Sequence, residues 1–306
     1  MLNMNAGVIG VGKIGSIHLN TYKNLKDIDK IYIVDIDKNK LLNYKDIPSF
    51  VDYKKLLNKV DIVSIATPTN THFEIAEFFL KNNISVLLEK PITDNIKQAE
   101  KLIEISKKNK TILFAGHIER YNNAYLAIKD IVKSPLFIEC HRISPYPNRS
   151  LDISVVLDLM IHDLDIILDL VNDKIKKIEA KGVCVLSKKE DIANTRITFK
   201  NGCVANITSS RISNKRERKI RIFLLNCYIS LDYANQEVQI YKKIKNKIIS
   251  KTLEIKKEEP FKKEIEEFIN LVKNKKIDFS SIEKAKEALE VALKIEEIIK
   301  KDSIIK

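Results

Sequence analysis

A lysine that directly follows an apolar run is the first residue in this chain whose position suggests chemistry. Residues 84–88 are almost all apolar, and Glu89, Lys90 and Pro91 follow them at once. Such a run before a proline is typical of a buried parallel strand, which Pro91 ends. The carboxyl end of a parallel strand borders the ligand crevice of an open α/β sheet. Lys90 is therefore a candidate for stabilising negative charge on a substrate, although a solvated lysine at a strand exit gives the same pattern.

An apolar helix farther along the chain carries a line of ionisable side chains. We expect this helix over residues 153–171, with Asp163 beside the line. The line itself has steps of four, three and four residues: Asp158, His162, Asp165 and Asp169. Four ionisable groups on one face of a buried helix favour a cleft lining over the alternative of a satisfied core histidine. A histidine titrates near neutrality, so His162 is a candidate general base and Asp158 a group that orients it.

The elements that must position these residues begin with a glycine-rich loop. A strand is expected over residues 5–9, and a helix runs from the loop to about residue 25. Between them lies Gly10-Val11-Gly12-Lys13-Ile14-Gly15, the G-x-G-x-x-G pattern of a dinucleotide site in its required context. A second strand, residues 30–34, ends in Asp35. An acid at that place accepts hydrogen bonds from ribose hydroxyls and repels a 2′-phosphate, so the expected cofactor is NAD rather than NADP.

A polar turn follows the next strong strand, residues 61–66, and opens a helix to about residue 82. Thr and Asn in such a turn are first of all helix caps, and Thr71 fits that role. Their place at the crevice edge also makes the turn a candidate for cofactor contacts. The predicted cofactor-binding residues are Gly10, Gly12, Lys13, Ile14, Gly15, Asp35, Ile36, Ala66, Thr67, Pro68, Asn70, His72, Glu89 and Lys90.

Two domains are expected. Six strands alternating with helices define an α/β Rossmann dinucleotide-binding domain over residues 1–117. Residues 118–306 predict an α+β domain with a large, mostly antiparallel open sheet between 176 and 252, a primed-type hairpin turn at Asn201-Gly202, and two closing helices. Few helices in this segment are available to cover so large a sheet, so we expect a homo-oligomer, a dimer or a tetramer, joined through it.

Composition and charge exclude several classes of protein. The 306 residues are 44% hydrophobic and 31% charged, with no run of the roughly 18–20 apolar residues that a membrane helix needs. The net charge of +13 comes from lysines scattered among acids, which favours a solvated surface over nucleic-acid binding. The four cysteines show no C-x-x-C pairing, so we expect reduced thiols and no metal site. The lack of a long apolar run and of a secretion-signal pattern predicts a cytoplasmic protein without a membrane partner.

These motifs together resemble the glucose-fructose oxidoreductase and inositol dehydrogenase family, Gfo/Idh/MocA. The resemblance covers nearly the whole chain: the glycine loop, Asp35, Thr67-Pro68 with His72, Glu89-Lys90-Pro91, and Asp158 with His162 four residues later. It implies NAD-dependent oxidation of a secondary hydroxyl, with Lys90, Asp158 and His162 meeting the substrate. The family commonly has Asp-x-Gly-x-His preceded by paired glycines. Here Met160 and Val155-Val156 stand in those places, which puts a simple-polyol pocket in doubt.

Within the family, residues 116–122 and 142–165 are most similar to members that oxidise the 3-hydroxyl of UDP-N-acetylglucosamine. Those members make a 3-keto sugar that an aminotransferase converts to a 3-amino sugar for lipid A or related glycoconjugates. The candidate substrate-binding residues are Lys90, Arg120, Tyr121, Asn122, Arg149, Asp158 and His162. Either arginine could instead form a structural salt bridge. The open alternatives are a free sugar, an inositol or another nucleotide sugar as substrate, and a non-catalytic dinucleotide-binding sensor.

Overall fold

The computed structural model describes residues 3–147 and 153–304, and the chain divides into two compact units. The first unit is Met1–Ile118 with Glu259–Lys286, and the second is Glu119–Glu258 with Glu287–Lys306. The first boundary lies one residue from the predicted end of the dinucleotide-binding domain. The return of residues 259–286 to the first unit differs from the expected division, in which all of 118–306 formed the second domain.

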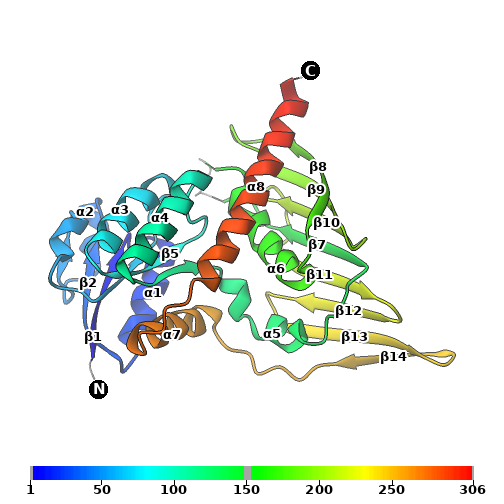
Figure 1. Ribbon diagram of the computed structural model, residues 1–306, viewed down its shortest axis with the longest axis horizontal. Coiled ribbons are helices and arrows are strands. Elements are labelled where there is room, and N and C mark those ends of the chain that lie inside the picture. Colours follow the sequence, from blue (N-terminus) through cyan, green and yellow to red (C-terminus); the bar gives the residue numbers. More distant parts are fainter. Residues whose placement is uncertain (1–2, 148–152, 305–306) are drawn as a thin grey trace. The chain divides into compact units, whose positions relative to one another are not determined.

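A six-stranded parallel sheet forms the centre of the first unit (Figure 1). Its strands are β1 (Met4–Ile9), β2 (Ile28–Val34), β3 (Ser49–Phe50), β4 (Ile62–Ile65), β5 (Ser85–Glu89) and β6 (Leu113–Gly116). They lie in the order β3-β2-β1-β4-β5-β6, so the strand order reverses between β1 and β4. This is the order of the doubly wound dinucleotide-binding fold, and the prediction of that fold is confirmed.

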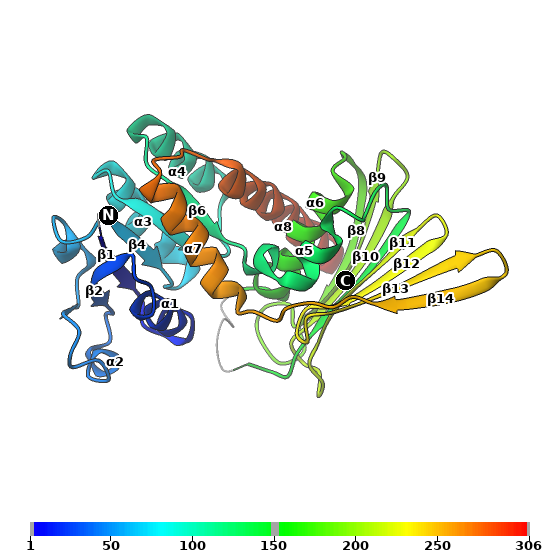
Figure 2. The same cartoon turned by 90° about the horizontal axis from the view of Figure 1, so that it is seen from below.

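Helices cover both faces of this sheet (Figure 2). The elements are α1 (Lys13–Lys23), α2 (Lys38–Leu41), the 3-10 turn η1 (Tyr53–Leu56), α3 (Thr69–Lys81), α4 (Ile96–Asn109) and α7 (Pro260–Lys273). α1 packs against α7, and α3 packs against α4. α7 joins this unit because its apolar face, including Ile265 and Phe268, is buried here; the Phe268 ring lies 5.8 Å from the ring of Phe114 on β6.

The second unit is built on an eight-stranded sheet. Its strands are β7 (Phe137–Ile143), β8 (Ile175–Val183), β9 (Ile192–Phe199), β10 (Val204–Ser210), β11 (Glu217–Leu224), β12 (Cys227–Asp232), β13 (Glu237–Ile244) and β14 (Lys247–Thr252). The order is β14-β13-β12-β11-β7-β10-β9-β8, and of these pairs only β7 with β10 is parallel. The mostly antiparallel sheet is therefore confirmed.

The helical elements of this unit lie against one face of the sheet, as both views show (Figures 1 and 2). They are α5 (Asn123–Lys129), the π-helical turn η3 (Val156–Met160), α6 (Ile161–Val171) and the part of α8 (Ser280–Ile304) that follows residue 286; the 3-10 turn η2 (Ile118–Tyr121) precedes α5. The strand residues on this face alternate with the others and are buried, as at Ile138, Ile222 and Ile229.

The opposite face carries a row of stacked aromatic rings. Phe137, Phe223, Tyr228 and Tyr241 stand on four neighbouring strands, with ring centroids 5.5, 4.9 and 5.3 Å apart in that order. All four side chains are only half-buried. In the second unit, the residues that the structure describes place no helix over this row.

The hairpin between β9 and β10 differs from the predicted primed turn. It has four connecting residues rather than two, and of these only Gly202 has a positive φ, +90°. The prediction of a primed-type turn was therefore wrong. A turn whose positive φ is confined to one glycine suits the longer connection.

The four cysteines are free thiols, as predicted. No helix in the described ranges is long and apolar enough to cross a membrane.

Candidate active site

The glycine-rich loop leaves open space at the first turn of α1. Gly10 has φ +84°, and a side chain at Gly15 would clash, because its Cβ would lie 1.7 Å from the carbonyl oxygen of Gly10. These two glycines are therefore required by the fold. A Cβ at Gly12 would meet nothing within 4 Å, and no side chain caps the helix there. Unfilled space beside the backbone N–H groups of a helix start fits the pyrophosphate of a dinucleotide.

Asp35 fixes this loop to the end of β2. Its Oδ2 accepts a hydrogen bond from the backbone N–H of Val11 at 3.0 Å, and its Oδ1 accepts one from Asp37 at 2.9 Å. Lys40 Nζ lies 3.5 Å from the same Oδ2. A carboxylate has about four acceptor positions, so these donors leave capacity for ribose hydroxyls. The adjacent Ile36 is 91% exposed and could lie against an adenine ring.

The turn after β4 is tied to the turn after β5 by His72. Its Nδ1 lies 2.9 Å from the carbonyl oxygen of Pro91 and its Nε2 lies 2.9 Å from that of Thr67. The ring is 1% exposed. His72 thus joins the two turns through both ring nitrogens, and the cofactor contact expected from the sequence stays a prediction. Thr71 bonds Thr67 and the Pro68 carbonyl through its hydroxyl, as a cap should, and α3 begins at Thr69, which places Asn70 in its first turn.

Lys90 follows β5 at the edge of the sheet where the glycine loop also lies, because β1, β4 and β5 are adjacent and parallel. Lys90 is half-buried, and its peptide bond to Pro91 is cis. Glu89 points into the protein instead: its Oε1 is 3.1 Å from Nε2 of His18. A cofactor contact was predicted for Glu89 from the sequence; in the structure its carboxylate is bonded to His18 inside the first unit.

Asp158 and His162 belong to the second unit and lie on two consecutive helical elements, whereas Lys90 belongs to the first unit. Asp158 lies in the π-helical turn η3 and His162 in the first turn of α6. The sequence expected one regular helix across both. Single π-helical turns within α-helices are common at functional sites. Asp158 is 9% exposed and His162 is half-buried.

The lower half of the predicted polar stripe is engaged in ion pairs. Asp165 Oδ2 lies 2.7 Å from Nε of Arg120, and Asp169 Oδ1 lies 3.1 Å from its Nη1. Burial disfavours the charged form of Arg120, but the two carboxylates outweigh burial and raise the pKa of the guanidinium. Arg120 therefore has the structural salt-bridge role that the sequence left open, and it anchors α6.

The other predicted substrate contacts divide similarly. Asn122 is 2% exposed and caps α5, accepting from the N–H of Ala124 at 3.1 Å and donating to the carbonyl of Tyr233 at 3.0 Å. Tyr121 ends the turn η2 and is half-buried. Arg149 lies outside the described residues.

The helix of Asp158 and His162 is held in place by residues that the sequence analysis did not single out. Arg142 on β7 makes a two-pronged ion pair with Asp163, both contacts at 2.9 Å, and a third contact of 2.9 Å with Glu119. This pair explains why Asp163 stands off the polar stripe: it faces the sheet. An arginine inside an alternating strand was the signal that could have revealed it.

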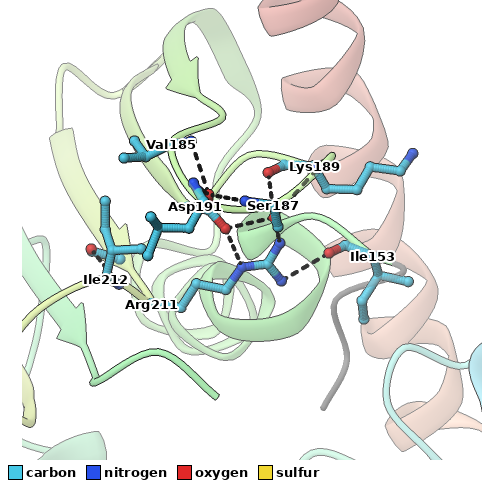
Figure 3. Close-up of polar contacts among 9 residues, drawn as sticks. Ile153, Val185, Ser187, Lys189, Asp191, Arg211 and Ile212 are labelled. Atoms are coloured by element: carbon cyan, nitrogen blue, oxygen red, sulfur yellow. Dashed lines mark hydrogen bonds and ion pairs between the residues drawn. The ribbon is translucent and has the colours of Figure 1, made fainter. Parts of the chain in front are cut away.

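A second buried cluster fixes the chain just before this helix (Figure 3). Arg211 donates from Nε to Asp191 Oδ1 at 2.9 Å, from Nη1 to the carbonyl of Ile153 at 3.0 Å and from Nη2 to Ser187 Oγ at 2.9 Å. Asp191 also accepts from the N–H groups of Val185, Leu186 and Ser187. Burial alone would raise the pKa of Asp191, but the hydrogen bonds from Ser187 and the backbone outweigh it and hold the pKa well below its usual range.

The departures from the family motif are core residues. Met160, Val155 and Val156 are each 0% exposed, and the sulfur of Met160 accepts a hydrogen bond from Thr195 Oγ1 on β9 at 3.4 Å. These side chains pack under the helix. The doubt that they raise about a simple-polyol pocket stays a prediction from the sequence.

Comparison with known proteins agrees with this geometry. Residues 4–117 match the oxidoreductase family with an NAD-binding Rossmann fold, and residues 137–227 match the GFO/IDH/MocA C-terminal domain. The UDP-N-acetylglucosamine 3-dehydrogenase of Acidithiobacillus ferrooxidans is 32% identical, covering 89% of this chain and 90% of that protein. A solved structure of that enzyme has a TM-score of 0.89 at 31% identity and covers 98% of both chains. The myo-inositol 2-dehydrogenase of Thermotoga maritima is 28% identical over 68% of this chain and 69% of its own length.

The fold and the glycine loop define an NAD-binding oxidoreductase. The chain belongs to the Gfo/Idh/MocA family, and it is an NAD-dependent dehydrogenase of the kind that acts on sugar and polyol hydroxyl groups. The predictions of family, fold class, enzyme class and cofactor are confirmed.

Proposed function

We propose that this enzyme oxidises the 3-hydroxyl of UDP-N-acetylglucosamine to a 3-keto sugar nucleotide. The observation that carries the proposal is the 32% identity, across nearly the whole chain, to a relative named for that reaction. The sequence resemblance in residues 116–122 and 142–165 supports the same substrate.

Oxidation of a secondary alcohol removes a hydroxyl proton while a hydride leaves the carbon. NAD, when bound, accepts that hydride. In our proposal His162 takes the proton as general base, because an imidazole titrates near neutrality. Lys90 stabilises the developing negative charge on the same oxygen, and Asp158 orients the imidazole or a neighbouring hydroxyl.

All of the proposed cofactor-binding residues belong to the first unit. We propose that Gly10, Gly12, Lys13, Ile14 and Gly15 hold the pyrophosphate and that Asp35 and Ile36 contact the adenosine half. The other proposed contacts come from the turn after β4: Ala66, Thr67, Pro68 and Asn70. In this proposal His72 and Glu89 position these contacts through their own buried hydrogen bonds, His72 to the carbonyl of Thr67 and Glu89 to His18.

Among the remaining substrate candidates, Tyr121 and Arg149 stay as proposed direct contacts. Arg120 and Asn122 act indirectly in this proposal, because their polar groups hold α6 and α5. An arginine at residue 149 would suit a diphosphate through its planar set of donors.

The test is incubation of the purified protein with NAD and UDP-N-acetylglucosamine, with 2-oxoglutarate added in parallel to reoxidise retained cofactor. We expect NADH absorbance, or loss of two hydrogen atoms from the sugar nucleotide by mass. His162→Ala should lower turnover by about 10² to 10⁴ and leave NAD affinity unchanged. Unchanged turnover in that variant would remove His162 from the mechanism.

A second candidate substrate is an inositol or a free sugar, since the myo-inositol 2-dehydrogenase relative also matches two thirds of the chain. Calorimetric titration with UDP separates the candidates. A sugar-nucleotide enzyme should bind UDP alone, whereas an inositol enzyme should show no affinity for it.

We also propose that a second copy of the chain covers the open face of the eight-stranded sheet, over the row of Phe137, Phe223, Tyr228 and Tyr241. Half-buried aromatic side chains in a contiguous row are typical of association surfaces. Sedimentation should show a dimer or tetramer that Phe223→Glu dissociates. Lys251→Glu, on the edge strand β14, should leave the assembly intact. A monomeric wild-type protein would rule the interface out.

A further inference from the structure

A buried cluster of His18, Glu89 and Glu264 lies in the first unit, next to Lys90 in sequence and structure. The three residues come from α1, β5 and α7, and they are 0%, 8% and 0% exposed. One nitrogen of His18 and one carboxyl oxygen from each glutamate lie within 4.8 Å of one another. Two carboxyl groups and an imidazole therefore share a space with almost no access to water.

Glu89 is the ionised member of the cluster. Its Oε1 lies 3.1 Å from Nε2 of His18, and its Oε2 accepts a hydrogen bond from the backbone N–H of Lys90 at 3.2 Å. Burial raises the pKa of Glu89, but the hydrogen bond from His18 and the charges of His18 and Lys90 outweigh burial and lower it. The carboxylate is also closely enclosed, because a Cβ on Gly116 would lie 3.1 Å from its Oε1.

Glu264 differs from Glu89 in its hydrogen bonding. Among the residues that the structure describes, neither carboxyl oxygen of Glu264 has a hydrogen-bond partner. Burial and the neighbouring charge of Glu89 both raise the pKa of Glu264 well above its usual value. His18 lies beside both glutamates, Tyr22 on α1 lies close enough to Glu264 for their charges to interact, and the charge of Lys90 after β5 acts on Glu89. A second buried carboxylate here would carry a large desolvation cost, so the carboxyl group keeps its proton.

We infer that Glu264, as a neutral carboxylic acid, acts with His18 to hold the Glu89 carboxylate in place and so positions Lys90. A protonated carboxyl group has one O–H donor. The acceptor beside it is the Glu89 carboxylate, whose oxygen lies within 4.8 Å of a Glu264 carboxyl oxygen. One bridging water or a small side-chain rotation closes the gap. The role assigned to Lys90 rests on the proposed function; the protonation of Glu264 does not.

The protonation is tested without substrate. Infrared difference spectra of the wild type against Glu264→Gln at neutral pH should show the carbonyl band of a protonated carboxyl group that the variant lacks. Absence of that band would overturn the inference. Metal analysis of the purified protein provides a second check, since a stoichiometric ion bound by the three residues would require a deprotonated Glu264 and would equally overturn it.

The positioning role is tested by a pair of variants of similar size. Glu264→Gln keeps a neutral hydrogen-bonding group and should retain turnover within about threefold. Glu264→Leu removes it and should lower kcat about tenfold, with KM for NAD and the circular dichroism spectrum unchanged. Equal turnover in the two variants would contradict positioning.

A readout that needs no turnover separates failure of this inference from failure of the proposed function. Lysine nitrogens can be dimethylated with ¹³C and the Lys90 signal assigned by its loss in Lys90→Arg. We expect the Lys90 chemical shift to move in Glu264→Leu and to be restored in Glu264→Gln. If the wild type fails to oxidise any sugar nucleotide yet this pattern holds, the proposed function is wrong and the positioning stands. An unmoved Lys90 signal would sink the positioning whatever the substrate.

Discussion

A buried charge cluster of the second unit, Asp191 with Arg211, and one of the first unit, His18 with Glu89 and Glu264, each lie beside a part of the proposed catalytic set, and the two are built differently. In the second unit, Asp191 and Arg211 are both 0% exposed, and donors surround the carboxylate. In the first unit, His18, Glu89 and Glu264 include a carboxyl group that has no described partner. The Asp191–Arg211 cluster stabilises an ion pair and fixes the backbone at Ile153, before the helix of Asp158 and His162. In the cluster next to Lys90, we infer that Glu89 is ionised and that Glu264 keeps its proton.

Burial alone does not decide whether an acid is ionised in these two clusters. Burial opposes charge in both clusters, yet the pKa of Asp191 is lowered and that of Glu264 is raised. Hydrogen-bond donors aimed at the carboxylate make the difference.

The largest effect is expected from removing one partner of the complete ion pair. Asp191→Ala leaves the guanidinium of Arg211 buried without its carboxylate, so the free energy of unfolding should fall by about 3–5 kcal/mol. Replacing both residues, as in Asp191→Leu with Arg211→Met, should recover much of that loss because no charge remains buried. Urea unfolding followed by circular dichroism measures both. A double variant as unstable as the single one would show that the backbone hydrogen bonds, rather than the ion pair, dominate.

Matched amide substitutions sharpen the contrast between the two acids. Asp191→Asn removes a charge and should cost about 3 kcal/mol. Glu264→Gln replaces a neutral acid with a neutral amide of the same shape and should cost less than about 1.5 kcal/mol. The same unfolding measurement applies to both variants. Equal costs would mean that Glu264 is ionised in the folded protein.

The two clusters should respond to pH with opposite signs. The folded pKa of Asp191 is lowered, so its stabilising contribution is present above the unfolded pKa and is lost as pH falls toward the folded value. The folded pKa of Glu264 is raised, so its contribution is present below about 4.5 and is lost as pH rises through the folded value. The stability of Glu264→Gln relative to the wild type should therefore increase as pH rises. A pH-independent difference would contradict the raised pKa.

The smallest effect is expected from crowding the Glu89 carboxylate. Gly116→Ala places a methyl group 3.1 Å from Glu89 Oε1, so the side chain must shift by a few tenths of an ångström. We expect a loss of about 1 kcal/mol in stability and a few-fold loss in kcat, with NAD affinity preserved. Gly182→Ala is the control in the other unit, because its methyl group would press on Ile299 and Glu190 rather than on a proposed catalytic element. It should lower stability without a specific loss of kcat.

Local patterns in the sequence were enough for much of the fold. The glycine loop with its following acid, the apolar run ending at Lys90 and the alternation of strands with helices predicted the parallel sheet and its ligand edge, because each depends on neighbours within one or two elements. The polar stripe also placed Asp158 and His162 on one helical segment.

Long-range contacts were not readable in the same way. Nothing local distinguishes Asp165 and Asp169, which pair with Arg120, from acids that line a cleft. The same holds for Met160, which stands where the family motif commonly has glycine and which the structure places against Thr195 in the core. Glu264 stands on the apolar face of α7, a signal visible in sequence, but its partners lie in elements about 175 and 246 residues earlier.

The sequence by itself determined which residues can do chemistry in this protein: a dinucleotide loop, a lysine at a strand end, and an acid and a histidine on a buried helix. Only the tertiary structure decided which other charges serve those residues. In the structure α7 belongs to the first unit, Arg211 binds the backbone before the helix of Asp158 and His162, and Asp191 has donors that Glu264 lacks among the described residues. The physical reason is that a side chain's type fixes what it can donate or accept, whereas its charge in the folded state depends on partners that only packing supplies.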